Sequence, residues 1–564
     1  MSRRCCGRGP EGGSFGVHDI SLLGGVSLIA NTILGSGMVQ IPTLFQQSGW
    51  LLPTAVFLLA AAGTAAAALL LARTVTKVPG NSDLSQRVEY ARLMGSLLPR
   101  WASAVGMVLL IVSFIAQNIS NIILSAQVAD DALLAAAHRT CGLVFYPPQA
   151  SGSPWLCIAA DSDSIITDSP FGPGVYALSI GYVIVAALTL PLSYLSLDNN
   201  IVFQMIGMAL ILVCEVVWLA NFAALGLSSA SLTALSPQAS SGGWLAAYSG
   251  ILPTVLFNYG FVAAIPSWLN EKGPAVRTRT TIVISVVLAT ALYLALGFVG
   301  AASVLDFGSG ADLLSLLAST DGVWTVSKIG VFVFPAANFM TSIPIFSVLV
   351  RYNLVNEGWA SPLVANIVGV GVPWAASLFF YAGNQLSELM NWSSALCFAL
   401  VNLAIPLTLY LRQRAAMITT AGASSGGAAA KLAAAMLEDA DEAAAAAAAA
   451  RAGAGTGAGA GYLDADGDGA GPLLLSEFAG AASAINAAWG SDDPRVAAGS
   501  SLDADEDIRP TPECCRRRII GDTRLALALL AASVVAAAAG FALQCYQEVS
   551  NDTGGGGGGG GGGR

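Results

Sequence analysis

Eleven long apolar segments follow one another along this chain, and they constrain its fold more than any other feature. Each reaches the length of about 20 residues that an α-helix needs to cross a bilayer. They lie near residues 21–44, 49–72, 101–127, 174–193, 200–226, 246–268, 280–303, 324–349, 361–382, 389–411 and 523–545. Only 11% of the residues are charged, against about 25% in a typical soluble domain. The sequence therefore predicts an all-α polytopic membrane protein with about eleven transmembrane helices.

The basic residues indicate how these segments are oriented. If the N-terminus lies in the cytoplasm, all but Arg139, Lys328 and Arg564 of the 25 Lys and Arg residues fall on the cytoplasmic side. Cytoplasmic loops of membrane proteins carry such an excess of Lys and Arg. We therefore expect a cytoplasmic N-terminus, in the plasma membrane or in a vacuolar or other endomembrane, because both follow the same charge rule.

The composition divides the chain into five parts. A polar cytoplasmic tail (1–20) precedes a ten-helix core (21–412), whose two halves span about 21–226 and 246–411. An Ala/Gly/Asp-rich segment (413–521) reads as a disordered cytoplasmic linker, because it has too few large apolar residues to form a core. An eleventh helix (522–546) and a Gly-rich tail (547–564) complete the chain.

Two covalent modifications are expected on the side opposite the cytoplasm. Of the nine cysteines, only Cys141 and Cys157 share one polar loop, which also holds five acidic residues from Asp130 to Asp168. If that loop faces an oxidising compartment, the two cysteines are candidates for a disulfide. Asn551 begins an Asn-Asp-Thr glycosylation sequon, although a chance match explains this triplet equally well.

The sequence contains no enzyme signature. Its two histidines, His18 and His138, lie outside the apolar segments, and metalloprotease, serine-hydrolase and P-loop motifs are absent. We therefore expect neither catalysis nor a nucleic acid partner, and no cofactor beyond a coupling ion.

Polar residues inside the apolar segments are the informative ones, because such groups are costly in a membrane and usually line a pathway. Gln117 and Asn121 share a helical face of the third segment, and Asn121 is a candidate substrate-binding residue. Glu215, in the fifth segment, is a candidate proton-coupling site. Close helix packing accounts for the first pair equally well, and a protonated or hydrogen-bonded acid accounts for Glu215.

Two apolar segments carry helix-weakening glycines at corresponding places. The first contains ANTILGSGMVQIP (residues 30–42), and the sixth, five segments later, contains LFNYGFVAAIP (residues 256–266). Interrupted helices in equivalent positions of two halves point to an inverted-repeat transporter with its binding site at the interruptions. The free backbone N–H groups there suit a carboxylate, and the free carbonyls suit an ammonium or a cation.

Three motifs resemble the amino acid/auxin permease family, which includes the sodium-coupled neutral amino acid transporters. They are NTILGSGMVQIP in the first segment, IPSWLNEK (residues 265–272) and SIPIFSVLVRYNL (residues 342–354), and the likeness extends over about residues 15–415. The resemblance implies a 5+5 inverted-repeat core of the leucine-transporter type, with one extra C-terminal helix. This sequence departs from the family pattern in the sixth segment, where the His-Pro pair that the better-known members often carry is missing.

The resemblance also implies roles for particular residues. Backbone N–H groups of Gly35, Ser36 and Gly37 would bind the substrate carboxylate. Three residues of the sixth segment would line the amino-group side: Phe257, Asn258 and Tyr259. Three others match a sodium site: Asn31, Thr341 and Ser342. A proton-coupled protein would instead depend on Glu215, so the expected coupling ion is either Na⁺ or H⁺.

The sequence thus predicts a secondary active transporter that moves a small-molecule amino acid by alternating access. The alternative is an amino acid sensor that binds its ligand and signals through the 413–521 linker, whose length is the only feature that favours it.

Overall fold

The computed structural model describes residues 19–423, apart from 83, 85, 147–153, 160–169, 172–174, 229–230, 236–247, 249, 306, 308–312, 382–392 and 394–396, together with Ala526 and Leu529. The predicted N-terminal tail up to residue 18, almost all of the linker and eleventh helix, the Gly-rich tail and Asn551 lie outside the described residues.

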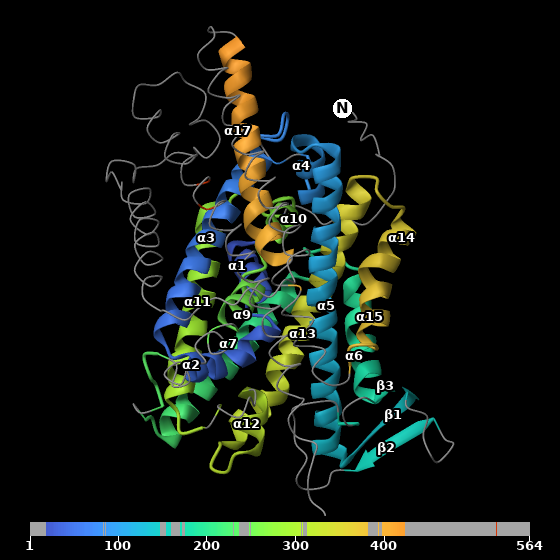
Figure 1. The fold of residues 1–564 in the computed structure, drawn as a ribbon. Helices are drawn as coiled ribbons and strands as arrows, with labels where there is room; N and C mark the ends of the chain where they lie inside the picture. Colours follow the sequence, from blue (N-terminus) through green and yellow to red (C-terminus); the bar gives the residue numbers. More distant parts are fainter. Residues whose placement is uncertain are drawn as a thin grey trace, which may run out of the picture.

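The described part is a bundle of long helices that run in roughly the same direction (Figure 1). Six helical segments in it are long and apolar enough to cross a membrane: α3 (Leu51–Thr76), α5 (Arg100–Ala137), α7 (Ile201–Leu225), α9 to α10 (Ile251–Leu269), α11 (Thr278–Ala302) and α13 (Thr325–Asn356). A bent pair that begins with α1 makes a seventh span. The predicted spans one, two, three, five, six, seven and eight therefore have helices at their positions.

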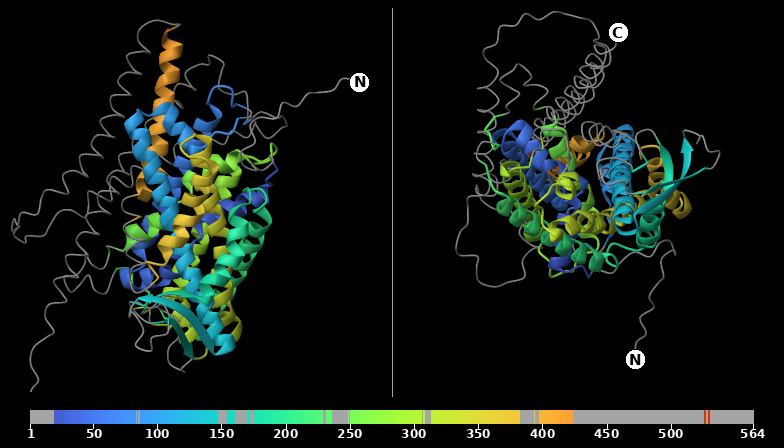
Figure 2. Two further views of the ribbon diagram at one scale, coloured as in Figure 1. Left: turned by 90° about the vertical axis from the view of Figure 1, so that its right-hand side faces the viewer. Right: turned by 90° about the horizontal axis from the view of Figure 1, so that it is seen from below.

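Shorter helices occupy the remaining predicted spans. They are α6 (Ile180–Ser193), then α14 (Pro362–Asn366), η4 (Ile367–Gly371) and α15 (Val372–Ser377), and finally η6 (Leu400–Ala404) and α17 (Ile405–Ala423). Two short helices lie between spans: α4 (Tyr90–Leu97) and α12 (Leu313–Ser319). Seen end-on, the helices pack side by side (Figure 2).

Two spans are broken, and both are built in the same way. In the first, α1 (Leu22–Ile33) gives way to the 3₁₀ helix η1 (Ser36–Gln40) and then α2 (Ile41–Ser48), with a bend of 52°. In the sixth, α9 (Ile251–Asn258) leads through η3 (Val262–Ala264) to α10 (Ile265–Leu269). Each second half begins with an Ile-Pro pair. Proline suits this place because its missing N–H is one that a helix start leaves unbonded.

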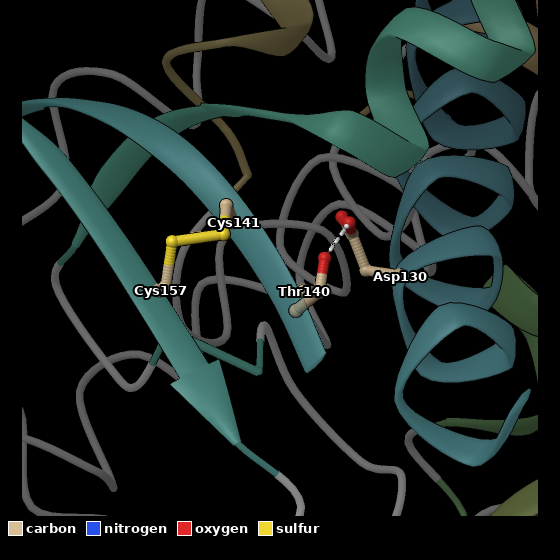
Figure 3. The surroundings of a disulfide bond; sticks show 4 residues. All are labelled: Asp130, Thr140, Cys141 and Cys157. Carbon is tan, nitrogen blue, oxygen red and sulfur yellow. Dashed lines mark hydrogen bonds between the residues drawn. A yellow bond between two sulfur atoms is a disulfide. The ribbon is translucent and has the colours of Figure 1, made fainter. Parts of the chain in front are cut away.

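A small sheet caps one end of the bundle. Its strands are β1 (Arg139–Tyr146), β2 (Trp155–Ala159) and β3 (Tyr176–Ser179), antiparallel in the order β2-β1-β3. Cys141 and Cys157 lie opposite each other on β1 and β2 and form a disulfide (Figure 3). The sheet lies at the opposite end of the bundle from α4 (Figure 1).

Asp130 was expected in the loop that holds the disulfide, but it lies on α5. The helix α5 continues past the predicted end at residue 127 to Ala137, and Asp130 is fully buried on it. Its carboxylate accepts hydrogen bonds from Thr140 Oγ1 (2.8 Å), Gly181 N (2.9 Å) and Tyr381 Oη (2.8 Å). These three donors repay the desolvation of the charge, so Asp130 joins α5 to the sheet and to α6.

Candidate functional site

A closed cavity lies where the two broken helices meet. Residues of α1, η1, α5, α9 and α13 line it: Thr32, Ile33, Gly35, Ser36, Gln117, Asn121, Phe257, Asn258, Ser342 and Phe346. Its volume is about 10 Å³, which is room for about one water molecule. An amino acid therefore fits only after the surrounding helices move apart.

Three polar oxygen atoms in this lining have no hydrogen-bond partner within the described part of the chain. They are Ser36 Oγ, Gln117 Oε1 and Asn121 Oδ1, on side chains that are 4–5% exposed. Leaving a buried polar atom unpaired costs about 1–3 kcal/mol. Three such atoms around one cavity indicate a site that is completed by a polar ligand or by water.

Aromatic rings form the apolar walls of the cavity. Phe257 packs against Phe398 with ring centroids 5.2 Å apart, and Phe346 packs against Phe114 at 6.0 Å. Because both inner rings are held from behind by a second ring, the walls suit a flat apolar group.

Tyr293 of α11 connects the two breaks. Its hydroxyl donates to Ile33 O, the last carbonyl of α1, and lies 3.2 Å from Asn258 Oδ1 at the end of α9. Sequence reasoning missed this residue. The signal for it is a hydroxyl-bearing ring within the mostly apolar seventh span.

Gly37 and Tyr259 do not line the cavity. A Cβ added at Gly37 would lie 2.5 Å from Asn258 Oδ1, so this glycine allows η1 to approach α9 closely. The Tyr259 hydroxyl is 2.6 Å from Thr290 Oγ1 on α11 instead. Of the predicted substrate-binding residues, the structure brings together Gly35, Ser36, Asn121, Phe257 and Asn258.

Two of the residues expected to hold sodium, Asn31 and Thr341, are hydrogen-bonded to Gln204 of α7, which the sequence did not single out. Asn31 Nδ2 donates to Gln204 O (2.8 Å) and Oε1 (2.9 Å), while Gln204 Nε2 donates to Thr341 O (2.9 Å). Ser342 Oγ donates to Asn338 Oδ1 (2.9 Å). The amide of Gln204 thus joins α1 to α13. Within the described residues, no group of three His, Cys, Asp or Glu side chains is placed to hold a metal ion.

Glu215 lies on α7, outside the cavity lining. It is fully buried, and neither carboxylate oxygen has a hydrogen-bond partner among the residues described. It is close enough to Tyr293 to act on that residue electrostatically. Glu215 therefore lies near a residue that contacts both breaks.

Comparisons with known proteins agree with this arrangement. Mhp1, a nucleobase-cation-symport-1 family transporter in a closed conformation with bromovinylhydantoin bound, is similar over 96% of both chains, with 12% identity and a TM-score of 0.50. The chain has a leucine-transporter-type fold. This confirms the predicted fold class. A manganese transporter of Eremococcus coleocola is similar over 92% of this chain and 94% of its own, with 16% identity and a TM-score of 0.40.

Residues 18–146 match the tryptophan/tyrosine permease family. This segment includes the first broken helix and all of α5, and so it contains Gly35, Ser36, Gln117 and Asn121. The matched family is one of amino acid permeases, in agreement with the predicted function class and not with an enzyme. No curated protein sequence matches this chain at a significant level.

Proposed function

We propose that this protein is a secondary active transporter for aromatic amino acids, and that the cavity between the two breaks binds the substrate. The observation that carries the proposal is the position of the cavity, at the meeting point of two interrupted spans, with three unpaired oxygens and the rings of Phe257 and Phe346 in its lining. The tryptophan/tyrosine permease match of residues 18–146 supports an aromatic substrate.

In this proposal the substrate carboxylate binds at the start of η1, whose first N–H groups have no partner within the helix. The N–H of Gly35 itself donates to Ile33 O (2.8 Å). The aromatic side chain lies between Phe257 and Phe346. The likeness of three motifs to the amino acid/auxin permeases supports the same general placement. A cytoplasmic N-terminus, and the division into two five-helix repeats, belong to this proposal.

We also propose that the coupling ion is a proton and that Glu215 binds it. Its unpaired, buried carboxylate is accommodated more easily as the neutral acid. Among the candidate sodium residues, Asn31 donates its amide N–H to Gln204, and Gln204 donates to the backbone carbonyl of Thr341.

The direct test is uptake of radiolabelled tryptophan into proteoliposomes that contain the full chain, compared with Gly35→Leu. A Cβ at Gly35 would meet only Ile33 O, at 4.0 Å, so the backbone tolerates a side chain here, but the rest of a leucine would enter a cavity of about 10 Å³. We expect uptake to be lost while the variant still reaches the membrane.

The matched control is Gly250→Leu, because a Cβ at Gly250 would meet nothing within 4 Å and this residue lies outside the cavity. We expect it to transport normally. Uptake that survives Gly35→Leu would refute the substrate site. Saturable tryptophan binding without flux in the unmodified protein would indicate the sensor alternative instead.

A further inference from the structure

Two carboxylates, Glu89 and Glu271, are buried outside the membrane-spanning segments. They are 1% and 0% exposed, at the end of the bundle where α4 lies (Figure 1). Burying an ionised carboxylate is costly unless it is paired and hydrogen-bonded. Neither residue lines the substrate cavity, so they have another role.

Glu89 joins α4 to the second half of the broken sixth span. It is the residue that precedes the first turn of α4. Its carboxylate accepts a hydrogen bond from Ser267 Oγ (2.5 Å) and another from Asn270 Nδ2 (2.8 Å). The same Asn270 side chain also accepts from Val88 N (3.1 Å). The start of α4 is therefore bonded to α10 and to the residue after it by hydrogen bonds that each include a side chain.

Glu271, directly after α10, binds three other parts of the chain. Its carboxylate accepts from Tyr352 Oη on α13 (2.9 Å) and from Asp198 N in the connection between α6 and α7 (2.8 Å). Its backbone carbonyl accepts from the amides of Asp19 (3.2 Å) and Ile20 (3.1 Å), just before α1. The end of α10 is thus bonded to α13, to the connection between α6 and α7, and to the residues just before α1.

These contacts hold in place the second half of a span whose first half lines the substrate cavity. The first half of the sixth span, α9, contributes Phe257 and Asn258 to the cavity. Its second half, α10, contains Ser267 and leads to Asn270 and Glu271. Together with Glu89, these three are called the latch residues. A substrate that leaves at this end requires α10 to separate from α4. Separation breaks the bonds of Glu89 and exposes its carboxylate to water.

We propose that these four latch residues form a proton-sensitive gate: protonation of Glu89 holds α10 against α4, and deprotonation releases it. The gate regulates the substrate site described above, so its role in transport rests on the proposed function. Its opening is a property of the fold that can be measured without a substrate.

The burial of Glu89 sets the direction of the effect. Burial raises its pKa to about 7, the hydrogen bonds from Ser267 and Asn270 lower it, and the charges of Glu271 and Arg87 raise and lower it respectively. Tyr352 and Asp198 also face the pair, and burial raises the pKa of Glu271 as well.

In the open gate the carboxylate is solvated and regains its ordinary pKa of 4.5. The closed gate therefore binds the proton more tightly. Its stability is present at acidic pH and is lost as the pH rises through about 7. Linkage then predicts that the ratio of closed to open protein rises about eightfold between pH 7.5 and pH 6.

The test is amide hydrogen exchange of the full chain in detergent or nanodiscs between pH 6 and pH 7.5, corrected for the intrinsic pH dependence of exchange. The reporter segments are α4 and α10. We expect their protection to increase about eightfold on acidification, with no such change in α11.

Three variants sharpen this test. Glu89→Gln imitates the neutral acid, and we expect α4 and α10 to lose their pH response. Ser267→Ala removes a bond that lowers the pKa of Glu89, so we expect the transition to move to higher pH. Glu357→Gln is the matched control, because Glu357 Oε2 lies against Gly95 of α4 but contacts none of the latch residues. We expect it to respond as the unmodified protein does.

Equal protection at both pH values, or loss of the response in Glu357→Gln as well, would overturn the proposal. If Glu89→Gln fails to fold, the shift of the pH transition in Ser267→Ala decides whether Glu89 is the group that binds the proton. A normal pH response in exchange together with no tryptophan flux would refute the proposed function but leave the latch in place.

Discussion

At the scale of single residues, the site depends on glycines whose missing side chains make room for polar groups of another span. A Cβ at Gly37 would strike Asn258, and one at Gly260 would lie 2.7 Å from Gln117 Nε2. The sequence indicated these glycines as weak points of two helices. It could not show which side chains occupy the space beside them, because that depends on how distant spans pack.

Gln117 offers a test at this scale. We expect its unpaired Oε1 to accept the ring N–H or O–H of a bound tryptophan or tyrosine, which phenylalanine lacks. In Gln117→Met the length of the side chain is kept and the acceptor is lost. An unmade hydrogen bond to a buried group costs about 1–3 kcal/mol, so preference for tyrosine over phenylalanine should fall roughly tenfold or more.

Competition of unlabelled tyrosine and phenylalanine against labelled tryptophan uptake measures this preference. Gln127→Met is a control on the same helix, since Gln127 donates to Tyr381 O and lies outside the cavity lining. An unchanged preference in Gln117→Met would show that Gln117 does not contact the aromatic side chain.

At the scale of elements, the sequence predicted the two breaks well, because glycine and Ile-Pro pairs act locally. It failed where an element is defined by distant partners. The extension of α5 beyond residue 127 is stabilised by Thr140, Gly181 and Tyr381 around Asp130, three residues far from one another in the chain. The three-stranded sheet was likewise not predicted, because its strands are short and lie within a polar loop.

The disulfide gives a prediction for this sheet. It closes a loop with a sequence separation of 16, and cross-linking a loop of about 15 residues stabilises by about 3 kcal/mol. Replacing Cys141 and Cys157 together by alanine should increase hydrogen exchange in β1 by about two orders of magnitude. Tryptophan uptake should remain, because the sheet does not line the cavity.

Dithiothreitol treatment of the unmodified protein should reproduce the effect on β1 and should have no further effect on the double variant. Faster exchange throughout α5 would contradict a role confined to the sheet.

At the scale of the whole molecule, the ten-helix plan followed from hydropathy and from the pairing of two breaks five spans apart. The residues that link the two halves did not follow from either of these patterns. Tyr293 and Gln204 have no sequence motif, and their roles follow from hydrogen bonds to α1 and α13 across more than a hundred residues of chain. Long-range partners of this kind are fixed by packing, which local pattern does not encode.

The driving ion is a property of the whole cycle, and it supplies the last prediction. With protons as the coupling ion, replacing sodium by choline should leave tryptophan uptake unchanged, and collapsing the pH gradient should stop accumulation. Glu215→Gln should abolish accumulation against a gradient but retain exchange of internal for external tryptophan, because exchange requires no net proton movement.

Accumulation that depends on sodium and survives Glu215→Gln would refute proton coupling. In that case Asn31→Ala and Gln204→Ala would be the informative variants, because these residues form the network at the alternative ion site.

The length of α5 has a mechanical consequence. Its 38 residues make a rod of about 57 Å, nearly twice the roughly 30 Å of bilayer hydrocarbon, and Asn121 lies near its middle. A tilt of about 5° around that point displaces each end by about 2–3 Å. Movements too small to resolve beside the substrate are thus amplified at the sheet, where probes are easy to attach.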